Sequence, residues 1–148
     1  MGDRALVQFR GSGGRGLDPV LSPCCYLHWA GSSVGSLLDE TAERMAERGP
    51  DVAYCFARFV GIAHESLGGA LSLGVWNQTE ELTADDSHGD AGCFVVTVDD
   101  AGMRIRCAGG YGFGNASASA GILYLPDGWT VDEGRFRVPW GGGSDARG

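Results

Sequence analysis

The sequence contains no lysine, so arginine supplies all eleven of its basic side chains. Nineteen aspartates and glutamates oppose them and give the chain a formal net charge of −8. Because a nucleic-acid-binding protein needs a basic surface to neutralise phosphates, this balance argues against nucleic acid as a partner. The missing lysine is most simply explained by a GC-rich genome, although arginine also offers planar forks that fit phosphate or carboxylate groups.

Long apolar runs and paired cysteines are also missing. No stretch approaches the roughly 18 apolar residues of a membrane span, and the N-terminal residues Met1 to Arg4 lack the apolar segment of a signal peptide. The five cysteines form an odd set without paired spacing, which favours free buried thiols over a disulfide framework. These features predict a cytoplasmic protein that has no membrane partner.

What the sequence does have is the size and composition of one globular domain. Its 148 residues are 43% hydrophobic and 20% charged, and large apolar side chains recur from Leu6 to Val138. A chain of this length buries roughly two thirds of the surface that it exposes when unfolded. We therefore expect a single domain over residues 1–140, followed by a flexible glycine-rich tail over residues 141–148.

The first half of the chain predicts two strands and two helices. Residues 5–10 alternate between apolar and polar, and residues 24–29, after a loop that extends to Pro23, predict a second strand paired with the first. Two apolar stripes with helical spacing follow, and each predicts a helix with one buried face. The first stripe is Val34, Leu37, Leu38, Ala42 and Met45, capped by Ser32 or Ser33; the second is Val52, Phe56, Phe59, Val60 and Ala63, capped by Asp51.

The second half predicts further strands. Residues 71–76 alternate as a strand, and residues 77–91 read as a polar, solvated loop. Residues 93–98 and 103–107 flank an acidic turn as a hairpin, and weaker patterns predict an edge strand at 122–125, a turn at 126–128 and a last strand at 135–140. The expected fold class is therefore α+β, a mainly antiparallel sheet of five to seven strands with two short helices on one face, in the order β-β-α-α-β-β-β.

No pattern predicts a catalytic centre, a metal site or a bound cofactor. Cys25 and His28 are three residues apart, a spacing that places them on opposite faces of a strand. His64 lacks the second histidine of a zinc-protease motif, because Gly68 stands at that position. The acidic cluster at residues 85–90 fits neither an EF-hand loop nor a zinc site. We therefore predict a protein that is not an enzyme.

One group of side chains does predict a ligand site. It consists of Tyr26, His28, Trp29, Arg58, Trp76 and Asn77. Aromatic rings stack on a purine, and a guanidinium and an amide hold a phosphate. If this group is a site, Arg58→Ala abolishes ligand binding without unfolding the protein. The alternative is that the rings seal the core and that Arg58 pairs with Asp51 or Glu65.

Several segments resemble a group of small proteins encoded by phages and prophages. They are Met1-Gly2-Asp3-Arg4-Ala5, Tyr26-Leu27-His28-Trp29-x-Gly31, Ala57-Arg58-Phe59 and Leu71-Ser72-Leu73-Gly74-Val75, within roughly residues 1–107. The resemblance implies a phage setting, in which small proteins without catalytic motifs are similar to counter-defence factors. The glycine-rich C-terminal segment lies outside the pattern.

The hypothesis that follows is a non-enzymatic phage counter-defence protein in the host bacterial cytoplasm. It binds and sequesters a small anionic ligand, for which a cyclic nucleotide immune signal is the expected example. The alternative is an acidic protein–protein inhibitor of a host defence complex, similar to an anti-CRISPR protein and favoured by the charge of −8. A third hypothesis is a hydrolase or transferase that uses Cys25 or residues 85–90. A homo-oligomer is expected, since closed twofold assemblies are common.

Overall fold

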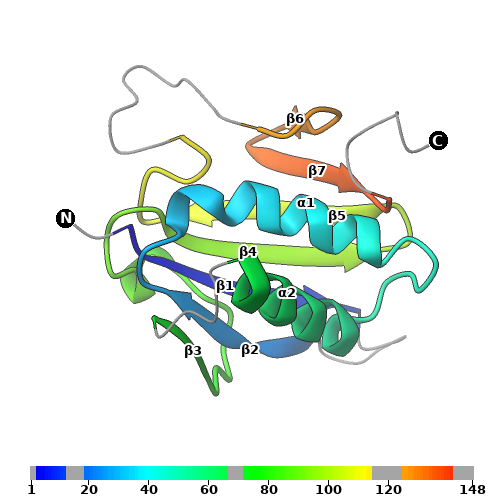
Figure 1. Cartoon of the computed structure of the whole chain (residues 1–148). Coiled ribbons are helices and arrows are strands. Elements are labelled where there is room, and N and C mark those ends of the chain that lie inside the picture. Colours follow the sequence, from blue (N-terminus) through cyan, green and yellow to red (C-terminus); the bar gives the residue numbers. More distant parts are fainter. Residues whose placement is uncertain (1–2, 13–18, 67–71, 115–124, 142–148) are drawn as a thin grey trace.

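The computed structural model describes residues 3–12, 19–66, 72–114 and 125–141. Over these residues the chain forms one seven-stranded sheet with two α-helices against one face (Figure 1). The elements are β1 (Ala5–Gly11), β2 (Val20–Leu27), η1 (Gly31–Ser33), α1 (Val34–Arg44), α2 (Val52–Ser66), β3 (Leu73–Trp76), η2 (Ala84–Asp86), β4 (Gly92–Asp99), β5 (Gly102–Ala108), β6 (Thr130–Asp132) and β7 (Arg135–Pro139). The predicted α+β class and the predicted order of its elements are confirmed.

The strands lie side by side in the order β3-β2-β1-β4-β5-β7-β6. β1 runs parallel to β4, and the other neighbouring strands of the described residues are antiparallel. The parallel pair lies near the middle of the sheet. After β2 the chain passes through both helices and adds β3 outside β2, and then it returns to place β4 on the other side of β1.

Alternation along the strands divides the sheet into a face that packs on the helices and an open face. On β1, Ala5, Val7 and Phe9 are buried against the helices in the main core. The Phe9 ring lies 5.6 Å from the Phe59 ring and 6.2 Å from the Phe56 ring of α2. Such aromatic contacts add to the free energy gained by burying apolar area, so this core fixes the helices on the sheet.

Both helices present the predicted apolar stripes to this core. The five stripe residues of the first helix are buried, and so are those of α2, except that Val60 is half-buried at the edge of the core. The predicted cap of α2 is confirmed, because the Asp51 carboxylate accepts a hydrogen bond of 3.0 Å from the Tyr54 N–H. Ser33 precedes α1, but its side chain makes no capping hydrogen bond.

β2 begins at Val20, four residues earlier than predicted. The predicted loop up to Pro23 is wrong because a bulge accommodates the proline within the strand: Ser22 and Pro23 together oppose Phe9 of β1. The Ser22 hydroxyl accepts the Phe9 N–H at 2.8 Å. The side chain thus supplies the acceptor that the interrupted ladder lacks, and the strand continues past a residue that cannot donate.

The last part of the sheet differs from the prediction in one element. The sequence predicts β7 but not β6, a three-residue strand that pairs with it across a turn at Glu133 and Gly134. Both turn residues have positive φ, at 50° and 76°. The predicted turn at 126–128 is present, whereas the predicted edge strand at 122–125 and the tail at 141–148 fall mostly outside the described residues.

Candidate functional site

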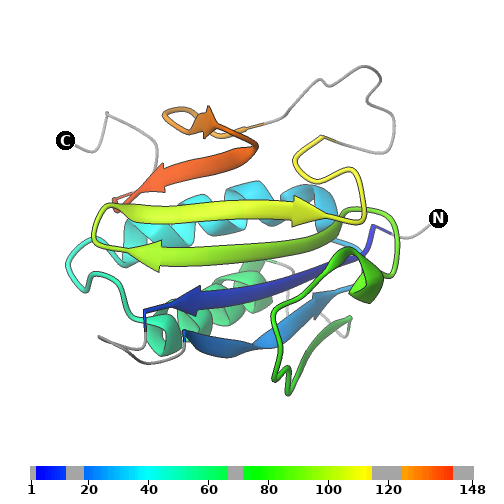
Figure 2. The same ribbon diagram turned by 180° about the vertical axis from the view of Figure 1, so that it is seen from behind.

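The sheet has an open face that points away from the helices (Figure 2). The polar side chains of interest lie on this face. Residues 77–91, here called the strap, connect β3 to β4 by crossing this face in front of β2 and β1. The strap divides the polar groups into two sets. One set lies beside the end of β2, and the other lies over β4, β5 and β7.

The strap is solvated along much of its length, as the sequence predicts, but it also has a side chain that is buried against the sheet. Its Leu82 is 1% exposed and packs in a second apolar cluster with Leu6, Cys24, Cys93 and Val95 of the open face. A single leucine among polar neighbours creates no periodic signal, because periodicity needs several apolar residues in register. The polar composition of the strap therefore gave no indication that Leu82 packs on the sheet.

Gln8 of β1 holds the strap in place. This fully buried side chain donates from Nε2 to the carbonyl oxygens of Ser22 at 3.3 Å and Glu80 at 3.1 Å. Its Oε1 accepts the Leu82 N–H at 2.9 Å. Because a buried amide that is bonded at both ends fits one arrangement of its partners, Gln8 sets the register of the strap on the sheet.

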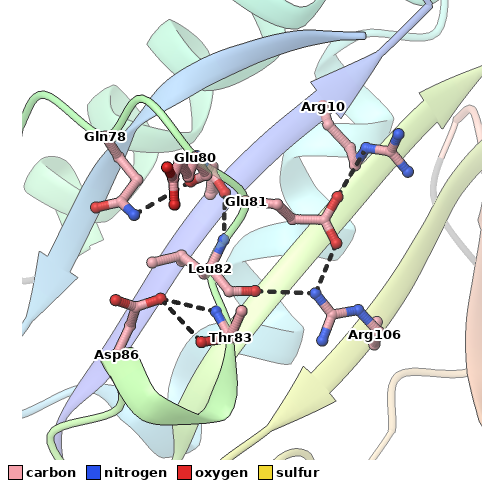
Figure 3. Close-up of polar contacts among 9 residues, drawn as sticks. Arg10, Gln78, Glu80, Glu81, Leu82, Thr83, Asp86 and Arg106 are labelled. Atoms are coloured by element: carbon pink, nitrogen blue, oxygen red, sulfur yellow. Dashed lines mark hydrogen bonds and ion pairs between the residues drawn. The ribbon is translucent and has the colours of Figure 1, made fainter.

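The strap also has a hydrogen-bonded turn of its own. Asp86 Oδ2 accepts the Thr83 N–H at 2.8 Å and lies 3.3 Å from the Thr83 hydroxyl, which closes a capping box around η2 (Figure 3). This contact and the Gln8 bonds fix the part of the strap between Glu80 and Asp86. The carboxylate of Asp86 therefore serves the local structure.

Five aromatic rings gather where β2 ends, and they form what we call the aromatic group: Tyr26, His28, Trp29, Trp76 and His88. The Tyr26 and Trp76 rings stack at 5.6 Å with 27° between their planes, and the His88 ring of the strap lies 5.3 Å from Tyr26 and 6.2 Å from Trp76. The Tyr26 hydroxyl shares a 2.5 Å hydrogen bond with His28 Nδ1. The Trp29 ring lies 4.4 Å from the His28 ring.

Strand pairing explains why these rings meet. Cys24 lies opposite Trp76 in the register of β2 and β3, and Tyr26 follows Cys24 on the same face of β2. Three rings of the group remain accessible, because Trp29 is 60% exposed, Trp76 is 39% exposed and His88 is exposed as well. Aromatic rings exposed together in this way are typical of binding surfaces.

A guanidinium lies beside these rings, and it belongs to Arg4. Its Nε donates to Asp90 Oδ2 at 2.9 Å, and the Arg4 backbone N–H donates to the same oxygen at 3.1 Å. The side-chain hydrogen bond raises the pKa of Arg4 and lowers the pKa of Asp90. Among the described residues the two Nη nitrogens of Arg4 have no hydrogen-bond partner. They remain available to a ligand next to His88, since Nη2 would lie 3.6 Å from a side chain placed at Gly89.

The structure brings together four of the six predicted ligand residues, namely Tyr26, His28, Trp29 and Trp76. Asn77 follows Trp76 directly and is exposed. Arg58 belongs to α2, which packs on the opposite face of the sheet (Figure 1), and its guanidinium lies 5.8 Å from the Tyr54 ring. The prediction that Arg58 lies with the rings is therefore wrong, because a helical stripe does not reveal which face of the sheet its helix covers.

Two residues that lie near the rings, His88 and Arg4, were not predicted from the sequence. His88 sits in the segment predicted to be solvated, and nothing in its surroundings indicated packing against Tyr26. Arg4 could have been found from alternation, because residues 4, 6, 8 and 10 share one face of a strand over 5–10. Extending the predicted strand pattern by one residue places Arg4 on the face of Tyr26.

A second set of polar groups, which we call the arginine cup, lies on the open face beyond the strap. Arg10, Arg104, Arg106 and Arg135 surround a hollow of about 190 Å³, together with Glu81, Thr97 and Val95. Glu81 Oε1 lies 3.1 Å from Arg10 Nε, and Glu81 Oε2 accepts a hydrogen bond of 2.8 Å from Arg106 Nη2 (Figure 3).

The cup and the aromatic group are separate. Leu6 lies opposite Tyr26 in the pairing of β1 and β2. Arg10 follows Leu6 by four residues, about 13 Å at the usual rise of a strand. Leu82 of the strap packs on the sheet between them, so one compact ligand cannot contact both sets.

The structure also shows how Cys25 and His28, the candidate catalytic pair, lie relative to each other. Cys25 packs among the core residues beneath the helices, whereas His28 joins the rings of the open face. Burial raises the pKa of Cys25 to about 12, and a neutral thiol is a poor nucleophile. Cys25 and His28 are therefore not arranged as a nucleophile and its base.

The acidic cluster at residues 85–90 has structural contacts instead of a metal-like arrangement. Asp86 caps η2, and Asp90 binds Arg4. Within residues 3–12, 19–66, 72–114 and 125–141, no three histidine, cysteine or acidic side chains come together in a way that could hold a metal ion. In the same ranges no helix is long and apolar enough to cross a membrane.

None of the protein-family models, curated proteins and solved structures compared with this chain matches it. What the protein binds is therefore inferred from the aromatic group and the arginine cup. The aromatic group offers ring faces with a guanidinium beside them. The cup offers clustered guanidiniums around a small hollow.

Proposed function

We propose that the protein binds and sequesters a small anionic ligand that carries an aromatic base, and that it acts without catalysis as a phage counter-defence protein. The observation that supports this function is the aromatic group, with Trp29 and Trp76 exposed and Arg4 beside it. A cyclic nucleotide immune signal is the expected ligand, because it combines flat bases with charged phosphates. The resemblance to phage-encoded proteins supports the setting.

The rings supply the larger share of the binding free energy in this proposal. Trp76 already lies nearly parallel to Tyr26 and His88, at 27° and 20° between ring planes. Its exposed face is ready for a base, and base–aromatic stacking contributes roughly 1–3 kcal/mol per base. Trp29, on the other side of His28, can stack on a second base.

Arg4 supplies the charge. Asp90 occupies the Nε side of its guanidinium and so leaves the two Nη groups directed elsewhere. A guanidinium that is held at one edge loses little rotational freedom when it binds a phosphate with the other. His88 is also held in place before any ligand binds, because it belongs to the strap and Gln8 fixes the strap to the sheet.

Isothermal titration against cyclic dinucleotides, cyclic trinucleotides, cyclic ADP-ribose isomers and mononucleotides tests this function. We expect one cyclic nucleotide to bind, and Trp76→Ala to weaken it about tenfold or more because a stacked base is lost. Arg4→Lys should weaken it as well, since a lysine keeps the charge but loses the fork. Arg58→Gln is the matched control, and its affinity should be unchanged.

Two results would contradict the proposal. The first is the absence of binding by every cyclic nucleotide tested. The second is an Arg58→Gln variant that loses as much affinity as Trp76→Ala, which would place the ligand on the helical face. In either case the aromatic group would not be the site.

A second function, an acidic protein–protein inhibitor of a host defence complex, is favoured by the outer side of α1. Asp39, Glu40 and Glu43 line a shallow hollow of about 540 Å³ with Leu125 and Pro126. Carboxylates in this arrangement complement a basic surface of the kind that holds nucleic acid. The function predicts that a host defence complex co-purifies with the protein, and that raised salt or Glu40→Lys removes it while Trp76→Ala does not.

A further inference from the structure

We propose that the arginine cup is a second binding site, independent of the aromatic group, for a compact anion that carries a phosphate. The candidate ligands are inorganic phosphate and the mono- or diphosphate group of a small molecule. The reasons are the pairing of like charges across the strands, a local shortage of acceptors, and one buried donor that lacks a partner.

The strands place arginines directly opposite one another. Arg104 of β5 faces Arg137 of β7, and continuing the same register by one residue beyond Ile105 and Phe136 places Arg106 level with Arg135. Like charges directly opposite each other in an antiparallel pair are destabilising. Carboxylates lie beside three of these four arginines: Asp99 is 3.3 Å from Arg104, Asp132 is 3.6 Å from Arg137, and Glu81 is 2.8 Å from Arg106. Among the described residues Arg135 is the member of the two pairs that lacks an ion-pair partner.

The acidic side chains around the cup do not balance its arginines. Glu81 bridges Arg10 and Arg106, and Asp99 lies 3.3 Å from Arg104. Among the described residues the guanidinium of Arg135 has no hydrogen-bond or ion-pair partner. Four arginines and two carboxylates leave a local charge of 4 − 2 = +2, although the whole chain carries −8.

Arg10 carries a buried donor that has no well-aligned acceptor. Its Nε is buried and lies 3.1 Å from Glu81 Oε1, a distance that fits an ion pair. The N–H direction does not fit a hydrogen bond, so this donor is unsatisfied within the described part of the chain. A buried N–H without an acceptor is unfavourable, and an anion oxygen in the hollow would relieve it.

The size of the hollow selects a compact ligand. Pockets for drug-sized ligands measure roughly 300–1,000 Å³, and the cup at about 190 Å³ is smaller. A phosphate or diphosphate group fits this scale, and guanidinium forks match its oxygens in bidentate pairs. Glu81 takes part of each fork of Arg10 and Arg106 and leaves their other N–H groups for the anion, so it is a positioning residue.

Titration calorimetry of the full chain with phosphate and with pyrophosphate, at an ionic strength held constant with sodium chloride, tests the proposal. We expect saturable binding that the double variant Arg106→Gln/Arg135→Gln weakens about tenfold or more. Arg48→Gln is the matched control, because Arg48 is an exposed arginine stacked 3.6 Å from the Tyr54 ring on the helical side. Its affinity for phosphate should equal that of the wild type.

A thermal measurement separates binding from folding. Because Arg106 and Arg135 repel each other, Arg135→Gln should raise the Tm of the ligand-free protein and remove the increase in Tm that phosphate causes. A purely structural role for Arg135 predicts a lower Tm without phosphate. That outcome would overturn the proposal.

Three other results would overturn it: no saturable binding at constant ionic strength, equal binding by the double variant, or binding of a single-stranded oligonucleotide without any binding of phosphate or pyrophosphate. The same variants test the proposed cyclic-nucleotide site independently of the cup. Trp76→Ala should leave phosphate binding unchanged, and Arg135→Gln should leave cyclic-nucleotide binding unchanged. One site can therefore fail while the other stands.

Discussion

At the scale of single residues, Gln8 has the widest influence on the open face. It is a buried amide beside an apolar cluster, and it makes hydrogen bonds to β2 and to the strap at once. Such a group stabilises the fold as long as each of its polar atoms has a partner. The positions of Glu81 in the cup and His88 among the rings both depend on the strap that Gln8 holds.

Gln8→Leu should lower the free energy of unfolding by roughly 1–3 kcal/mol, because it leaves the buried Leu82 N–H without its acceptor. Urea denaturation measures this loss. Gln78→Leu is the matched control, since Gln78 Nε2 also donates to the Glu80 carbonyl at 3.1 Å but does so at the surface. Its effect should stay within about 0.5 kcal/mol. Equal effects of the two variants would show that Gln8 does not anchor the strap.

Single residues also show what the sequence could predict about the site. Tyr26, His28 and Trp76 were predictable as a group, because alternation places Tyr26 and His28 on one face and a neighbouring strand can bring Trp76 beside them. Alternation alone would place Trp29 on the other face, and it lies beside His28 because β2 ends at Leu27. His88 was not predictable, because its partner Tyr26 lies 62 positions away (88 − 26) and contact over such a distance depends on the path of the strap.

At the scale of elements, the strap carries the bridge that organises the arginine cup. Glu81→Gln removes the charge that separates Arg10 from Arg106, and we expect a loss of about 1 kcal/mol, the upper end for a partly exposed pair. Phosphate should restore part of this loss. Glu65→Gln, which breaks the exposed pair of Glu65 and Arg44 at 3.6 Å, should cost less than about 0.5 kcal/mol. Urea titrations with and without phosphate compare the free energies of unfolding of the two variants. If Glu81→Gln leaves the free energy of unfolding unchanged, Glu81 does not stabilise the protein as a bridge between the arginines.

Gly102, the first residue of β5, cannot be replaced by a residue with a side chain without strain. Its φ is +143°, and a Cβ there would lie 2.1 Å from the Val138 carbonyl oxygen of β7. We expect Gly102→Ala to cost roughly 3 kcal/mol or more, because β7 must move away. Gly74→Ala in β3, where a Cβ meets nothing within 4 Å, should be nearly neutral. Thermal unfolding compares them, and a Gly102→Ala variant as stable as Gly74→Ala would contradict the close packing of β5 and β7.

Elements with a strong local pattern were predictable, and those that depend on distant partners were not. β1, both helices and the hairpin of β4 and β5 carry clear periodicity or turn chemistry in their own residues. The start of β2 depends on the Ser22 hydroxyl replacing a backbone acceptor. β6 is three residues long and exposed, so it has no core-facing pattern to detect.

At the scale of the whole molecule, burial of the thiols links stability to pH. Burial raises the pKa of Cys24, Cys25 and Cys107 to about 12 and that of Cys55 and Cys93 to about 11. In the unfolded chain these thiols ionise near their ordinary pKa of about 8.5. The stability that they contribute is therefore complete below pH of about 8.5 and declines as the pH rises toward the folded values.

We expect the free energy of unfolding to fall above pH of about 8.5 by up to about 1.4 kcal/mol per pH unit for each thiol that is ionised only in the unfolded chain. Urea titrations under reducing conditions between pH 7.5 and 10.5 measure this slope. Ellman's reagent at pH 8 should react slowly with the native protein and fully after denaturation. A flat profile to pH 10, or rapid reaction of the native protein, would show that the thiols are not protected.

The parallel pair in the middle of the sheet has a consequence for how the chain is made. β1 and β4 meet with Ala5 beside Gly92, so 92 − 5 = 87 positions separate partners that touch. At a synthesis rate of about 5–20 residues per second, the inner edge of β1 waits roughly 4 to 17 s for its neighbour to leave the ribosome. During that interval its unpaired N–H and C=O groups can template strands from other nascent chains. The yield of native protein should therefore depend on how slowly and how sparsely the message is translated.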